Sequence, residues 1–176
     1  MTEPAKMSHP LASVGGIAGA IGGWTLSQYC GASIWIPGAA ISLFLLLFTK
    51  SPIRPRYFAG AIATTAAHMT WFIVGSAITG VWSATALDII ALGIGIVWLW
   101  ARPGLLAVLF LGLVQAGSLA FNAYTIISVP FGSAPHRALT AHCVFRLIAI
   151  ICLVVGYIRL RRERSTPPPV PSVVTP

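Results

Sequence analysis

The chain has 176 residues, of which 57% are hydrophobic and 8% are charged, and its formal net charge is +8. A soluble domain of this size carries about a quarter charged residues, so this chain cannot cover a globular surface with polar side chains. We therefore expect an all-α, polytopic membrane protein that is surrounded by the lipid bilayer. We attribute its positive charge to membrane topology and anionic lipid, and not to nucleic acid binding.

Six apolar segments predict six transmembrane helices. A helix needs about 20 residues to cross the hydrocarbon core of a bilayer. The segments run over residues 11–29, 34–49, 58–79, 84–100, 104–127 and 138–158. Together they define a membrane domain at 11–158. A short cytoplasmic segment at 1–10 precedes this domain, and a basic, then proline-rich and disordered tail at 159–176 follows it.

The first segment carries Gly15, Gly19 and Gly23 at four-residue spacing. Glycines on one face of a helix let a second backbone approach closely, which is a common way of packing helices in lipid. We expect this face to pack against another span, a partner membrane subunit or a second copy of the chain. The sequence leaves these three possibilities open.

The basic residues follow the alternation of the six segments. When the chain is threaded through a membrane, one side receives Lys6, Lys50, Arg54, Arg56, Arg102, Arg159, Arg161, Arg162 and Arg164. The opposite side receives only Arg137. Because cytoplasmic loops carry the excess of lysine and arginine, both termini are predicted in the cytoplasm. The expected location is a cell membrane, specifically a bacterial inner membrane.

A polar stripe runs along the segment at 104–127. Gln115, Ser118, Asn122 and Thr125 follow one another at offsets that trace one face of a helix. Unpaired amide groups are costly in lipid, so this face should turn toward the interior of the bundle. There it would either bond to a neighbouring helix or form one wall of a polar pocket.

The last segment brings charge into the membrane. His142 and Arg146 lie one helical turn apart, and Asp88 is the one acidic residue within any predicted span. An arginine inside a membrane needs a partner, and Asp88 is the obvious one. We expect an outward-facing polar pocket formed by Asp88, Gln115, Asn122, His142 and Arg146. A purely structural ion pair is the alternative.

Catalytic and metal motifs are not found in the sequence. The chain has three acidic residues in total and no Cys/His pattern with the spacing of a metal site. A bis-histidine haem would need His68 and His142 at similar depth, whereas the predicted spans offset them by about 9 Å along the membrane normal. We therefore expect no cofactor, with haem b as a disfavoured alternative that the sequence does not exclude.

The sequence leaves two main classes of function open, with a membrane sensor or enzyme domain as a third. The first is a membrane protein that binds or transports a small anionic or polar solute through the outward-facing pocket. The second is a non-catalytic structural or assembly subunit of a larger membrane complex, in which the polar residues only hold helices together.

Overall fold

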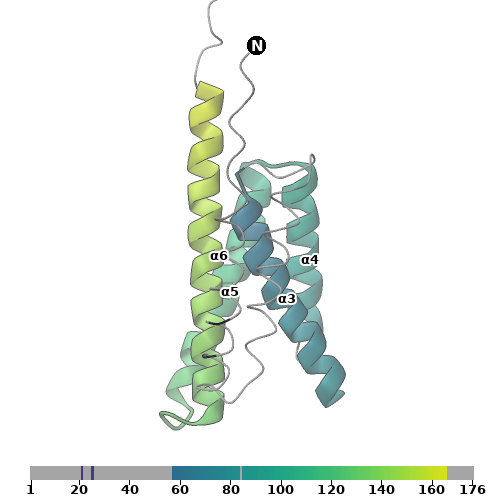
Figure 1. Ribbon diagram of the computed structural model, residues 1–176, viewed down its shortest axis with the longest axis vertical. Coiled ribbons are helices and arrows are strands. Elements are labelled where there is room, and N and C mark those ends of the chain that lie inside the picture. Colours follow the sequence, from purple (N-terminus) through teal and green to yellow (C-terminus); the bar gives the residue numbers. More distant parts are fainter. Residues whose placement is uncertain (1–20, 22–24, 26–56, 84, 166–176) are drawn as a thin grey trace, which may run out of the picture.

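The computed structural model describes residues 21, 25, 57–83 and 85–165 of the chain, and within them it contains four α-helices and no strand (Figure 1). The helices are α3 (Ala59–Thr79), α4 (Ala86–Ala101), α5 (Leu105–Ile127) and α6 (Ala134–Ser165). The segments predicted at 58–79, 84–100 and 104–127 match α3, α4 and α5 to within two residues at each end. The first two predicted segments lie outside the described residues, apart from Ile21 and Thr25, which are helical.

Glycine and proline determine where the helices stop. Gly80 ends α3 with a left-handed backbone at φ 72°, and its N–H bonds to the Ser76 carbonyl, which is a common way to close a helix. Arg102 ends α4 with a non-helical backbone at φ −140° and ψ 76°, because the next residue is Pro103, whose ring disfavours a helical residue before it. Gly104 has an extended backbone and immediately precedes α5.

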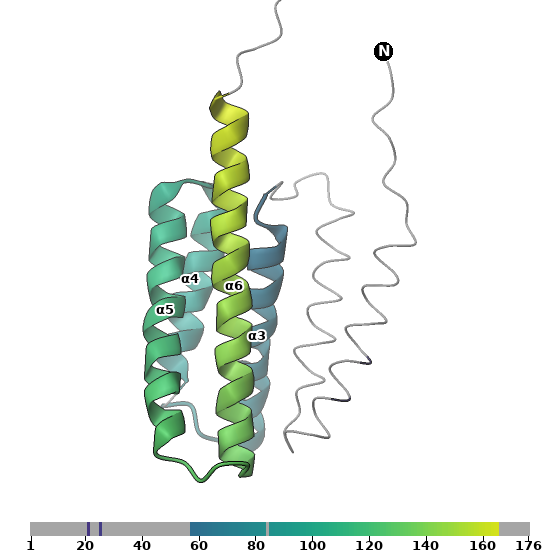
Figure 2. The same cartoon turned by 90° about the vertical axis from the view of Figure 1, so that its left-hand side faces the viewer.

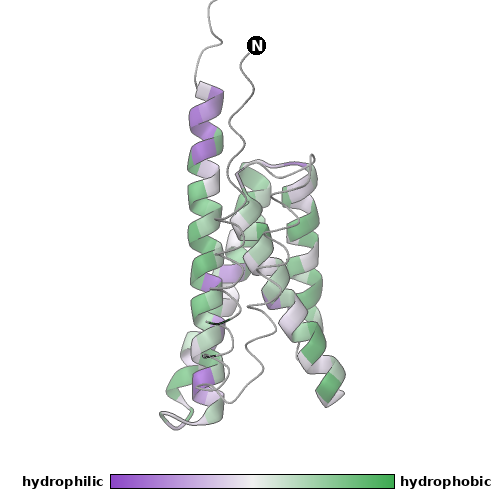
Figure 3. Cartoon of the chain, in the orientation of Figure 1, coloured by the Kyte–Doolittle hydropathy of each residue, from purple (hydrophilic) through white to green (hydrophobic). Residues whose placement is uncertain are grey.

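Helix α6 is longer than the predicted span at 138–158. It has 32 residues, or about 48 Å at 1.5 Å per residue, against a hydrocarbon core of about 30 Å. Its last two turns are rich in arginine and appear as the hydrophilic upper part of α6 in Figure 3. The tail predicted from residue 159 therefore begins as helix up to Ser165. Arginine is a good helix former, and positive charge is favoured at a helix C-terminus.

The helices form an up-and-down ring in which each packs on two neighbours. α3 contacts α4 and α6, and α5 contacts the same two helices. The start of α3, the α4–α5 connection and the end of α6 therefore point in one direction (Figures 1 and 2). We call this the arginine-rich end, because it carries Arg102, Arg159, Arg161, Arg162 and Arg164. The other end carries the α3–α4 and α5–α6 connections and, among the basic residues that the structure describes, Arg137.

The outer surfaces of the bundle are apolar. Leu87, Leu113 and Ile127 are each more than two-thirds exposed. Three helices, α3, α5 and α6, are long and apolar enough to cross a membrane, and α4, with 16 residues, is shorter. A surface of this kind is unfavourable in water and suits the hydrocarbon of a bilayer. The described part of the chain is thus a helical bundle of the membrane type.

Close contacts at two glycines hold the half of the bundle nearest the arginine-rich end. A Cβ atom added to Gly156 in α6 would lie 2.6 Å from the carbonyl oxygen of Tyr57, just before α3. A Cβ atom added to Gly95 in α4 would lie 2.7 Å from Cδ1 of Leu111 in α5. Both glycines are buried, so these helices approach more closely than a side chain would allow.

Candidate functional site

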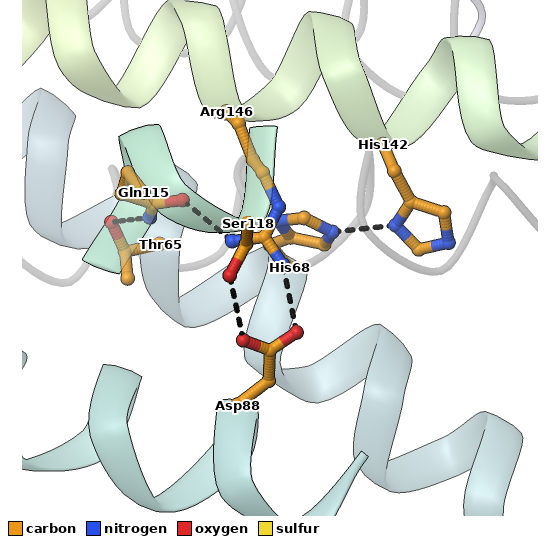
Figure 4. A network of polar contacts seen from close by, with 7 residues as sticks. All are labelled: Thr65, His68, Asp88, Gln115, Ser118, His142 and Arg146. Carbon is orange, nitrogen blue, oxygen red and sulfur yellow. Dashed lines mark hydrogen bonds and ion pairs between the residues drawn. The ribbon is translucent and has the colours of Figure 1, made fainter. Parts of the chain in front are cut away.

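A polar network joins all four helices near the middle of the bundle (Figure 4). Its members are Thr65 of α3, Asp88 of α4, Gln115 and Ser118 of α5, and Arg146 of α6. The surrounding core is apolar, so each polar group needs a partner within the bundle. The network supplies partners from helices that are far apart in the sequence, although Nε of Arg146 is buried without one.

Arg146 is the centre of the network. Its Nη2 donates to Oδ2 of Asp88 at 2.9 Å, and its Nη1 donates to Oε1 of Gln115 at 3.0 Å. The residue is 0% exposed. The planar guanidinium suits this position because its two arms can reach acceptors on two different helices. The pairing of Asp88 with Arg146 that the sequence predicted is confirmed.

Gln115 and Ser118 extend the network from α5. Gln115 Nε2 donates to Oγ1 of Thr65 at 3.2 Å, which links α5 to α3 across the ring. Ser118 Oγ donates to Oδ1 of Asp88 at 2.9 Å. The predicted polar stripe thus turns inward at these two residues. The hydroxyl of Thr125, its last member, donates to the carbonyl of Phe121 in its own helix and not to another helix.

Asp88 lies where a carboxylate is stabilised by the backbone as well as by its partners. It occupies the first turn of α4, where the unpaired N–H groups of the helix favour negative charge. Its side chain is 30% exposed, whereas that of Arg146 is 1% exposed. The ion pair is therefore asymmetric, because the cation is sealed inside the bundle and the anion reaches its surface.

Two histidines form a second polar contact beside the network. His68 Nε2 and His142 Nδ1 lie 2.6 Å apart, within hydrogen-bond distance. Aromatic rings of α3 stack on them: the centroids of Trp71 and His142 are 4.2 Å apart, and those of Phe72 and His68 are 4.7 Å apart. His68 is 1% exposed. We call these two residues the histidine pair.

The predicted depth offset between the two histidines was wrong. α6 begins at Ala134 instead of 138, so His142 lies about two turns inside its helix and not one. α3 is also inclined relative to α6 (Figure 1), and the 2.6 Å contact shows that the two side chains meet. Two nitrogens that bind one haem iron from opposite faces lie about 4 Å apart, at about 2 Å per bond, so the 2.6 Å contact is not the arrangement of an axial pair. The expectation that no cofactor binds stays a prediction.

A cleft of about 370 Å³ opens beside the network, toward the end opposite the arginine-rich end. Polar side chains from three helices and the α3–α4 connection line it: Thr85, Asp88, Ser118, Asn122 and His142. Its remaining lining is Phe72, Leu87, Gly117, Phe121 and Leu139. A cleft of this size, mostly apolar with a few convergent polar groups, is typical of small-molecule sites.

The structure divides the five predicted pocket residues into two groups. Asp88, Asn122 and His142 line the cleft. Gln115 and Arg146 are each 0% exposed and lie behind it in the polar network. The sequence thus identified residues that gather in one region, but it did not reveal that the arginine is sealed away from the cleft. Whether these residues bind a solute stays a prediction.

Sequence reasoning missed Thr65 and the rings around the histidines. Thr65, His68 and Phe72 recur at three- and four-residue spacing on the third segment, so they share one face of α3. That spacing could have extended the predicted site to this helix. Gly15, Gly19 and Gly23, predicted as a packing face, lie outside the described residues.

Comparison with known proteins adds no assignment. A scan of family models, a search of curated proteins and a search of solved structures each find no match to this chain.

Proposed function

We propose that this chain is a multi-pass membrane protein that binds a small polar solute in the cleft and supports its passage across the membrane. The observation that carries this proposal is the asymmetry of the ion pair. A purely structural pair would be covered on both sides, whereas the Asp88 side chain is 30% exposed and faces a cleft. A partly exposed carboxylate among apolar helices is a functional candidate by default.

The proposed topology has six spans with both termini in the cytoplasm. The grouping of Arg102, Arg159, Arg161, Arg162 and Arg164 at one end of the described helices supports it, because basic residues accumulate on the cytoplasmic side. The cleft would then open outward. In a background without native cysteines, an impermeant thiol reagent applied to cells should label Ser133→Cys and spare Ser165→Cys. The opposite labelling pattern would reverse the topology.

Solute binding can be tested with one glycine. Gly117 lines the cleft, and a Cβ atom added there meets nothing within 4 Å. Gly117→Leu should therefore occupy the cleft without disturbing helix packing. Gly112 is a matched control, because it lies on the same helix, is also open to a Cβ atom and does not line the cleft.

Native mass spectrometry of protein released from gentle detergent is the measurement. We expect a small-molecule adduct on the wild type and on Gly112→Leu, and its loss from Gly117→Leu. If the wild type and both variants give the same spectrum, the cleft does not hold a solute.

In that case a structural or assembly subunit becomes the better assignment. The observation in its favour is that the polar network connects all four helices and leaves Arg146 entirely buried. A network of this kind would hold the bundle together even if nothing entered the cleft.

A further inference from the structure

The charge presented to the cleft is negative, although the chain as a whole is positive. Arg146 does not line the cleft and is 0% exposed. Its Nη1 and Nη2 already donate to Gln115 and Asp88. Among the residues that line the cleft, Asp88 is the acidic one and none is a lysine or arginine, so an anion in the cleft would meet a carboxylate. The cleft therefore disfavours the anionic solute that the arginine alone had suggested.

The part of the cleft wall formed by Asp88 and Ser118 offers acceptors, whereas donors are carried as well elsewhere in the lining, by Thr85, Asn122 and His142. A carboxylate has about four lone-pair positions, and Asp88 uses one on Oδ1 for Ser118 and one on Oδ2 for Arg146. Ser118 gives its only O–H to Asp88, so its oxygen can only accept from a ligand. These two neighbouring side chains together favour a ligand group that carries several N–H or O–H donors.

Aromatic and aliphatic side chains surround this polar spot. The rings of Phe72 and Phe121 line the cleft together with Leu87 and Leu139. The face of a benzene ring attracts a cation, and it equally accepts the carbon chain attached to one. A ligand with a cationic group and a short apolar chain would match both the carboxylate of Asp88 and the apolar side chains around it.

We propose that the cleft selects small organic ammonium ions, with the ammonium group at Asp88 and Ser118 and the carbon body against Phe72 and Phe121. This inference rests on the proposed function, because it names the class of solute that the same cleft takes. The guanidinium of Arg146 lies on the far side of the carboxylate and holds it in place for the ligand.

The test compares three probes of similar size: n-butylammonium, n-butanol and butanoate. Ligand-observed NMR would measure the binding of each to the full chain in nanodiscs at neutral pH. Specific binding is the difference between the signal of the wild type and that of Gly117→Leu. This difference excludes the probe that partitions into lipid, because both samples contain the same nanodiscs. We expect butylammonium to bind about tenfold more tightly than butanol, because a charged hydrogen bond is stronger than a neutral one, and butanoate not to bind.

Two variants locate the ammonium group. Asp88→Asn should remove the preference for butylammonium over butanol. Asp88→Asn also leaves Arg146 without its anion, so a second variant is needed. Phe121→Leu provides it, because Phe121 is 69% exposed and its replacement should leave helix packing unchanged. Phe121→Leu should weaken the binding of butylammonium about threefold, because it removes the aromatic ring face. Phe131→Leu is its control, since Phe131 is 93% exposed and does not line the cleft.

Equal or tighter specific binding of butanol or butanoate would overturn the ammonium assignment and leave solute binding intact. An affinity for butylammonium that is the same in the wild type, Asp88→Asn and Phe121→Leu would overturn it as well. If no probe shows specific binding, the ammonium assignment fails, and the native mass spectra decide separately whether the cleft holds another solute.

Discussion

The two halves of the bundle are held together by different forces. Toward the arginine-rich end, Gly95 and Gly156 bring helices into contact closer than a Cβ atom permits. Toward the cleft, side chains of Asp88 and Arg146 span the distance between helices with hydrogen bonds. Helices in lipid gain little from the hydrophobic effect, so they rely on close packing or on polar contacts, and this chain uses one in each half.

This difference explains why the cleft lies where it does. Helices that touch through glycine leave no space between them, whereas helices joined by long side chains remain further apart. α4 also has only 16 residues, or about 24 Å. At the end opposite the arginine-rich end, it therefore does not reach as far as α5 and α6 (Figure 2). The short helix places the Asp88 carboxylate inside the bundle and leaves a recess in front of it.

Arg146→Ala should cause the largest change, because it removes the hub of the polar half. Removing one partner of a fully buried ion pair costs about 3–5 kcal/mol, and because the remaining Asp88 side chain is 30% exposed we expect the lower end of this range, about 3 kcal/mol. SDS-induced unfolding in mixed micelles would measure the loss. Arg164→Ala is the control, because Arg164 is exposed and makes one long hydrogen bond of 3.4 Å to Pro103. Equal losses for the two variants would show that the network does not stabilise the bundle.

Gly156→Ala should cause the next largest change, in the closely packed half. The new methyl group would lie 2.6 Å from a backbone oxygen of Tyr57, which cannot rotate away. Overpacking of this kind costs about 1–3 kcal/mol in unfolding free energy. The same change at Gly112, where a Cβ atom meets nothing within 4 Å, should be neutral or slightly stabilising in the same assay. A neutral Gly156→Ala would contradict the close approach of α6 to α3.

Gly95→Ala should cost less than Gly156→Ala, about 1 kcal/mol, although the added Cβ atoms would lie at similar distances, 2.7 Å and 2.6 Å, from their nearest neighbours. The atom in its way is Cδ1 of Leu111, the end of a flexible side chain that can change rotamer. A double-mutant cycle with Leu111→Ala would reveal the contact as a non-additive loss of stability. Strict additivity would mean that Gly95 and Leu111 do not touch.

Thr65→Val should have the smallest effect, about 0.6 kcal/mol, which is typical of a hydrogen bond between helices in a membrane. It removes the acceptor for Gln115 Nε2 at 3.2 Å and keeps the shape of the side chain. Thr70→Val is the matched control on α3, because its hydroxyl bonds only to the carbonyl of Ala66 in the same helix. A larger loss for Thr70→Val than for Thr65→Val would argue against the link between α3 and α5.

The amino-acid sequence by itself determined the membrane class and the bounds of α3, α4 and α5. Apolar runs of this length have no stable alternative to a helix in lipid, and Gly80 and Pro103 stop the helices locally. It also determined the Asp88–Arg146 pair, because no other opposite charges lie within the predicted spans. Six spans and the direction of insertion stay predictions, since they depend partly on segments outside the described residues.

Tertiary structure alone decided which side of the ion pair faces the cleft. The start of α6 at Ala134 and the inclination of α3 set the depth of His68 against His142, and a hydropathy pattern carries no information on either. The spacing of residues in a helix gives the direction of a side chain relative to its own axis only. Whether Arg146 or Asp88 reaches the surface depends on the distances between helix axes, which are set by glycines and side chains many residues away.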